Sequence, residues 1–140
     1  MATPSAKGDA RPSAQVAGYN STAWVRVTNN FSGAADITLS HQYSSDPPQR
    51  QSWSNVQAGE ATGYMEVGFN LGFLRTGDDW WQVDVDVHAG PQAGHWSSDS
   101  HACMLKSDDK GTHMTFAVSP AGFEMFETSG SCHTGWSSQP

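Results

Sequence analysis

Three side chains with ligand-binding chemistry recur at every second position of one segment: Asp84, Asp86 and His88. Successive side chains of an extended chain point to opposite faces, so these three project the same way, together with Trp80. Carboxylates beside an exposed indole would suit a polar ligand such as a sugar, which can hydrogen-bond to the carboxylates while its ring stacks on the indole. We predict that these four residues, with Trp96 from the polar loop that follows, form a ligand-binding surface.

A metal ion is one alternative ligand for this acidic row, and a plain solvated face is another interpretation. Ca²⁺ prefers about six to eight oxygen ligands and a transition metal prefers more nitrogen, so one strand alone supplies neither set. Acidic side chains on a strand also keep a sheet soluble and prevent its pairing with other chains. We therefore expect no metal and no cofactor, and a solvated acidic face remains the alternative to a ligand surface.

Patterns typical of catalysis are weak in this chain. Its six histidines lie in different segments without the HExxH spacing of a zinc protease, and no G-x-S-x-G string places a nucleophile. We therefore name no catalytic residue. An enzyme in which the fold brings Asp and His together as acid and base remains an alternative.

The polar row lies on a strand whose other face is apolar, with Trp81, Val83, Val85 and Val87. This alternation predicts one face in a core and one face toward water or a ligand. Other short extended segments lie between turn residues, at 22–28, 36–43, 51–55, 62–69, 102–106, 112–118 and 123–126. No segment carries a helical stripe, so the sequence predicts an all-β antiparallel β-sandwich of about seven or eight strands.

The length of 140 residues suits one domain whose core is large enough to be stable without a metal ion or a disulfide. Residues 1–20 are rich in Ala, Ser, Pro and Gly without periodicity, which predicts a flexible N-terminal tail before a single sandwich domain at 21–140. No apolar run of about eighteen residues and no signal-peptide pattern occurs, so we expect a cytoplasmic protein without a transmembrane segment. A mature secreted form is the alternative.

The net charge of the chain indicates which kinds of macromolecule it can bind. Fourteen acidic and seven basic residues give a formal net charge of −7, and no run of Lys or Arg offers a local exception. A chain of this charge is repelled by phosphate backbones, so we expect no nucleic-acid partner.

The two cysteines, Cys103 and Cys132, have two alternative states. Because thiols stay reduced in the cytosol, we favour two free thiols. A disulfide is the alternative, and in the chain-entropy model it would stabilise the fold by roughly 3–4 kcal/mol.

A family resemblance rests on four strings and two single residues: His41-Gln42-Tyr43-Ser44, Trp53, Val56, Val67-Gly68-Phe69-Asn70-Leu71-Gly72-Phe73, Thr76-Gly77-Asp78-Asp79-Trp80-Trp81, and Cys103-Met104-Leu105-Lys106-Ser107-Asp108-Asp109-Lys110-Gly111. With these strings, residues 22–118 resemble the PUD proteins, a nematode and fungal family first noted as up-regulated in long-lived insulin-receptor mutants. The resemblance implies a β-sandwich that tends to dimerise, has no established enzymatic activity, and is similar in shape to fungal membrane-binding and lectin-like sandwiches. It implies no site residues.

The leading hypothesis is therefore a non-enzymatic β-sandwich that binds a polar ligand such as a carbohydrate or a lipid head group. The first alternative is a structural or oligomerising protein, a homodimer for example, without a small-molecule ligand. The second alternative is a small enzyme with Asp and His acid-base chemistry.

Overall fold

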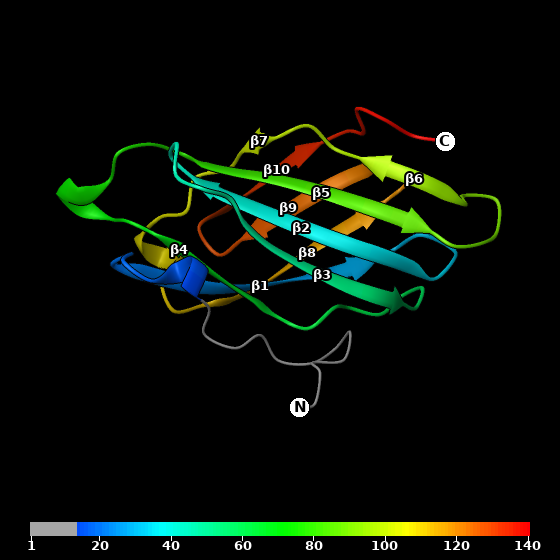
Figure 1. Cartoon of the computed structure of the whole chain (residues 1–140), viewed down its shortest axis with the longest axis horizontal. Coiled ribbons are helices and arrows are strands. Elements are labelled where there is room, and N and C mark those ends of the chain that lie inside the picture. The colour runs from blue at the N-terminus through cyan, green and yellow to red at the C-terminus, as the bar shows by residue number, and fades with distance from the viewer. Residues whose placement is uncertain (1–13) are drawn as a thin grey trace.

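Two packed β-sheets make up the computed structural model, which describes residues 14–140 (Figure 1). The first sheet has the strand order β10 (Gly130–Thr134), β9 (Gly122–Glu127), β8 (His113–Ser119), β1 (Ser21–Asn29) and β4 (Met65–Phe69). The second sheet has the order β3 (Gln49–Val56), β2 (Ala35–Tyr43), β5 (Asp79–Val87) and β6 (Gly94–Ser97), and β7 (His101–Ala102) also pairs with β5. The all-β sandwich predicted from the sequence is confirmed.

The described residues form ten strands, more than the predicted seven or eight. The additional strands are β6 and β10, which lie at the edges of their sheets, where backbone pairing alone suffices and no long alternation is required. Of the predicted segment 102–106, only the start is a strand, β7. One pair departs from the antiparallel expectation, because β1 and β8 run parallel. A parallel pair requires a long crossover, and here the chain passes through the whole second sheet between these two strands.

Three short 3₁₀ turns complete the described elements: η1 (Ala14–Val16), η2 (Gly72–Leu74) and η3 (Ser107–Asp109). Residues 1–13 of the predicted tail lie outside the described part of the chain. Within the described part, the Gln15 side chain accepts a hydrogen bond from the Arg50 backbone N–H and donates one to the Arg50 carbonyl. This pairing covers part of the open edge of β3. No helix between residues 14 and 140 is long and apolar enough to cross a membrane.

The core lies between the two sheets and contains the apolar face of β5. Trp81, Val83 and Val85 are fully buried and Val87 is 4% exposed, as the alternation predicted. Trp81 also packs edge-on against Phe116 of the first sheet, with ring centroids 4.9 Å apart. Each large apolar side chain buried in this way stabilises the fold by about 1.5–3 kcal/mol, so these residues hold the two sheets together.

A disulfide bond joins Cys103 and Cys132, so the favoured interpretation of two free thiols is wrong. Cys103 follows β7 on one sheet and Cys132 lies in β10 on the other, and their Cα atoms are 6.0 Å apart. This separation is typical of disulfides. Their approach depends on how the two sheets pack, and the spacing of the cysteines in the sequence does not show it.

Candidate functional site

The outer face of the second sheet consists of rows of polar side chains that run across the strands. The registers of β2, β3, β5 and β6 place these side chains in four successive rows. From the Trp80 end, the rows are Gln42 and Trp80; Arg50, Ser40 and Gln82; Ser52, Thr38, Asp84 and Ser97; and Asp36, Asp86 and His95. Side chains opposite one another in adjacent strands lie about 4.5–5.5 Å apart at Cβ. The face is therefore one continuous polar surface rather than a set of isolated groups.

A shallow pocket of about 180 Å³ lies at the Trp80 end of this face. Its lining comes from β2, β3, β5 and two loops: Ser40, Gln42, Pro48, Arg50, Trp80, Gln82 and Ser100. Trp80 is 38% exposed, whereas its neighbour Trp81 is fully buried. The Trp80 side chain has no aromatic contact and no hydrogen bond to any residue between 14 and 140, whereas its backbone pairs with β2 and β7. The pocket thus combines an uncovered indole with amide, hydroxyl and guanidinium groups.

Trp24, on the outer face of the first sheet, provides a contrast to Trp80. Its ring stacks on His113, with centroids 4.8 Å apart and planes within 9° of parallel. Tyr64 meets the same histidine edge-on, and Arg26 lies over the Tyr64 ring. These outward-facing aromatic groups are partly covered by one another. The indole of Trp80 is available to another molecule.

The predicted residues Asp84, Asp86 and His88 lie on the same outer face as Trp80, but they point to different partners. Asp84 accepts a hydrogen bond from Ser97 at 2.7 Å. His88 Nε2 lies 3.0 Å from a carboxylate oxygen of Asp36, and both side chains are exposed at the far end of the face. The carboxylates are therefore engaged with neighbouring side chains.

His95 is a member of this face that the sequence analysis did not name. Its Nδ1 lies 2.6 Å from Asp86 and its Nε2 lies 3.4 Å from Asp84. The hydrogen bond to Asp86 raises the pKa of His95. No group of three or more His, Cys, Asp or Glu side chains in the described range 14–140 is placed to hold a metal ion. The arrangement is a surface ion-pair network.

Trp96 does not belong to this surface, which corrects the predicted set. It is opposite Val85 in the register of β5 and β6, so its side chain points into the core and is only 7% exposed. Its ring packs against Phe31, with centroids 4.9 Å apart, and its indole N–H donates to the Gln92 carbonyl. The segment around Trp96 has weak alternation in the sequence, and its inward orientation follows only from pairing with β5.

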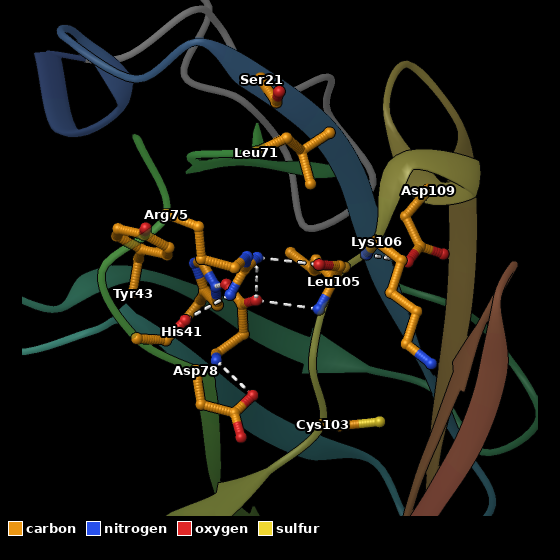
Figure 2. Close-up of polar contacts among 12 residues, drawn as sticks. Ser21, His41, Tyr43, Leu71, Arg75, Asp78, Cys103, Leu105, Lys106 and Asp109 are labelled. Carbon is orange, nitrogen blue, oxygen red and sulfur yellow. Dashed lines mark hydrogen bonds and ion pairs between the residues drawn. The ribbon is translucent and has the colours of Figure 1, made fainter. Parts of the chain in front are cut away.

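A buried polar cluster lies beneath the loop that leads into β5 (Figure 2). Asp79 accepts hydrogen bonds from His41 at 2.8 Å, from Arg75 at 3.0 Å and from the Leu105 backbone N–H at 2.8 Å. Arg75 also donates to the Leu105 carbonyl and lies over the Tyr43 ring. His41 and Asp79 are fully buried, so this histidine and carboxylate stabilise the loop and are not open to a substrate.

The orientation of Gln49 determines how His41 is bonded in this cluster. The Gln49 side chain accepts from the Gly68 N–H and donates to the Gly68 carbonyl, which directs its oxygen toward His41 Nδ1 at 3.0 Å. Both ring nitrogens of His41 therefore face oxygen acceptors.

A second pocket of about 180 Å³ lies beside the disulfide, and its lining includes Cys103, Lys106, Glu127 and Cys132. Glu127 is 8% exposed, and its Oε2 has no hydrogen-bond partner. Burial, with the nearby carboxylates Asp109 and Asp79, raises the pKa of Glu127 to about 9. This side chain is therefore a neutral carboxylic acid at pH 7.

Comparison with known proteins agrees with the family resemblance for its first three strings, for Trp53 and for Val56, and the string that begins at Cys103 lies outside the matched residues. No curated protein matches the chain. A family model described as "Up-Regulated in long-lived daf-2", PUD1_2, matches residues 19–102. This match includes β1 to β6 and the whole Trp80 face. Because it extends over more than half of the 140 residues, the chain belongs to this PUD family.

Proposed function

We propose that this protein binds a carbohydrate at the Trp80 pocket and holds it without chemical change. The observation that carries the proposal is an uncovered indole at the rim of a pocket otherwise lined mainly by hydrogen-bonding side chains. A sugar ring offers an apolar face for the indole and hydroxyls for the surrounding polar groups. Small-molecule sites in proteins typically combine these two kinds of contact.

The polar groups of the pocket have hydrogen-bonding capacity left for a ligand. Gln42 donates from its amide nitrogen to the Asp46 carbonyl, and Gln82 donates to Ser97 and to two backbone carbonyls. These bonds hold both amide groups in place, while their side-chain oxygens accept no hydrogen bond from residues 14–140. Preorganised acceptors of this kind reduce the ordering cost of binding a hydroxyl.

Replacing Trp80 by alanine should abolish binding on an array of glycans and lipid head groups while leaving the melting temperature almost unchanged. An exposed ring contributes little to the core, yet as an interface anchor it can contribute about 2 kcal/mol, roughly thirtyfold in Kd. Trp24→Ala, on the other sheet, is the matched control and should bind like the parent. Equal binding by the parent and Trp80→Ala would refute the proposal, and binding of lipid head groups alone would identify a different ligand class.

Self-association is a second candidate function, favoured by the loop between β4 and β5. Phe73 in η2 is 98% exposed and Leu74 is 49% exposed, and η2 lies at one extreme end of the molecule (Figure 1). Two neighbouring apolar side chains at a loop tip lose unfavourable contact with water when a second copy covers them. A homodimer through this tip would be the oligomerising protein that was the alternative to ligand binding.

Phe73→Ser should convert a dimer to a monomer if this loop holds two copies together. Light scattering coupled to size-exclusion chromatography measures the mass directly. Phe126→Ser is the control, because Phe126 is an exposed aromatic residue too, at 48%, but lies on β9, away from the loop. A parent protein that is monomeric at high concentration would remove this candidate.

A further inference from the structure

We infer that the Trp80 pocket selects an acidic sugar, with Arg50 binding the anionic substituent while the ring lies against Trp80. This inference rests on the carbohydrate binding proposed above and names the ligand class. The positive charge of the pocket lining comes from Arg50, and the lining holds no carboxylate. A neutral sugar would leave this guanidinium without an anionic partner.

The guanidinium of Arg50 is positioned on one side and open on the other. Its Nε donates to the Ser40 hydroxyl at 3.0 Å, which orients the group over the middle of the sheet. The Arg50 backbone is held by β2 and by the two hydrogen bonds to the Gln15 side chain. Its two terminal nitrogens make no hydrogen bond or ion pair to residues 14–140. They can therefore form paired, charge-assisted hydrogen bonds with a carboxylate, sulfate or phosphate.

The other cationic side chains of the described chain do not have this combination of features. Arg75 is bound to Asp79, and Arg26 lies over the ring of Tyr64 on the opposite sheet. Lys106 and Lys110 belong to the loop before β8 and line other pockets. Among these residues, Arg50 alone shares a pocket with an uncovered tryptophan.

The acidic rows of the same face lie beyond the pocket and contact histidines. Asp84 is one row further along than Gln82, and Asp36 and Asp86 are two rows further. His88 is paired with Asp36, and His95 is paired with Asp86 and Asp84. Repulsion of an anion at Arg50 is therefore moderated by the distance along the strands and by His95, whose pKa the hydrogen bond to Asp86 raises.

The size of the pocket limits the ligand to a small group. Its volume of about 180 Å³ lies below the roughly 300–1,000 Å³ of pockets that take drug-sized ligands. Arg50 and Trp80 project from strands separated by β2 and from adjacent rows, so their backbones are roughly 12 Å apart. A single sugar unit with one anionic substituent suits this separation, with longer glycans continuing into solvent.

The test compares the binding of three probes: glucuronate, glucose 6-phosphate and glucose. Binding is measured by nuclear magnetic resonance titration, from the shift of the Trp80 indole N–H resonance. The parent should bind at least one of the two acidic sugars about tenfold more tightly than glucose, the gain expected from a charge-assisted pair. The two acidic probes distinguish a planar carboxylate from a tetrahedral phosphate. Arg50→Gln should lower the affinity for the acidic sugar to the level of the affinity for glucose, and Arg50→Lys should restore part of the preference.

Arg26→Gln is the matched control, because the Nε of Arg26 also donates to a hydroxyl, that of Thr115, at 2.9 Å. This variant should keep the preference for acidic sugars. Equal affinity of the parent for glucose and for both acidic sugars would overturn the inference while leaving carbohydrate binding intact. No response to any probe, together with a blank glycan array, would overturn both. An acid preference that survives in Arg50→Gln would exclude Arg50 as its cause.

Discussion

Replacing Asp79 by alanine should lower the free energy of unfolding by about 3–5 kcal/mol, because it removes the centre of a buried ionic cluster. His41 and Arg75 then lose their carboxylate partner, and the Leu105 backbone N–H loses its acceptor. The total stability of a domain is about 5–15 kcal/mol, so this loss is a large part of it. Urea denaturation at constant pH, with the slope compared between variants, measures the change.

Two further variants serve as comparisons for Asp79→Ala: one removes a different acid, and one removes only the charge of Asp79. Asp108→Ala removes an exposed carboxylate in η3 and should shift the free energy of unfolding by less than about 0.5 kcal/mol. Asp79→Asn keeps the shape of the side chain and removes its charge, so it should fall between the parent and Asp79→Ala even if the alanine variant does not fold. A loss below about 1 kcal/mol in Asp79→Ala would show that the cluster is not important for the fold.

Replacing Glu127 by glutamine should stabilise the protein above neutral pH and remove part of its sensitivity to base. The pKa of Glu127 is about 9 in the fold, against 4.5 for an ordinary glutamate. Between these values the folded state holds a proton that the unfolded state has released, so stability falls as pH rises, on the order of 1 kcal/mol per pH unit. Below pH 4.5 both states are protonated and the effect disappears. Glutamine imitates the neutral acid at every pH.

The measurement is urea denaturation of the parent and Glu127→Gln from about pH 4 to pH 9. The difference between the two proteins should grow steadily in favour of Glu127→Gln as pH rises. Glu124→Gln is the control, because Glu124 lies on the same strand, faces outward and pairs with His133. It should show no comparable rise. A constant difference between parent and Glu127→Gln across the range would mean that Glu127 is ionised in the fold.

The Glu127 result also bears on the disulfide, since both groups line the same pocket. Ionisation of Glu127 above pH 9 would place an unpaired charge beside the bond that joins the two sheets. A buried charge of this kind draws in water or unfolds its surroundings. The end of the sandwich near β10 should therefore be the first region to loosen in base.

The amino-acid sequence alone determined the character of the two faces of β5. Alternation is a local property, because each peptide unit turns the next side chain to the opposite side whatever the rest of the fold does. The separation of exposed Trp80 from buried Trp81, and the all-β class, could therefore be predicted.

Only the tertiary structure decided which residues meet. Arg50 and Trp80 share a pocket because β2 lies between their strands, and Trp96 points inward because of its register with β5. Glu127 is buried because β9 lies against the segment that carries Cys103 and Asp109. Its Oε2 has no hydrogen-bond partner there. These contacts join segments far apart in the chain, and they depend on strand order and sheet packing, which alternation within one strand does not encode.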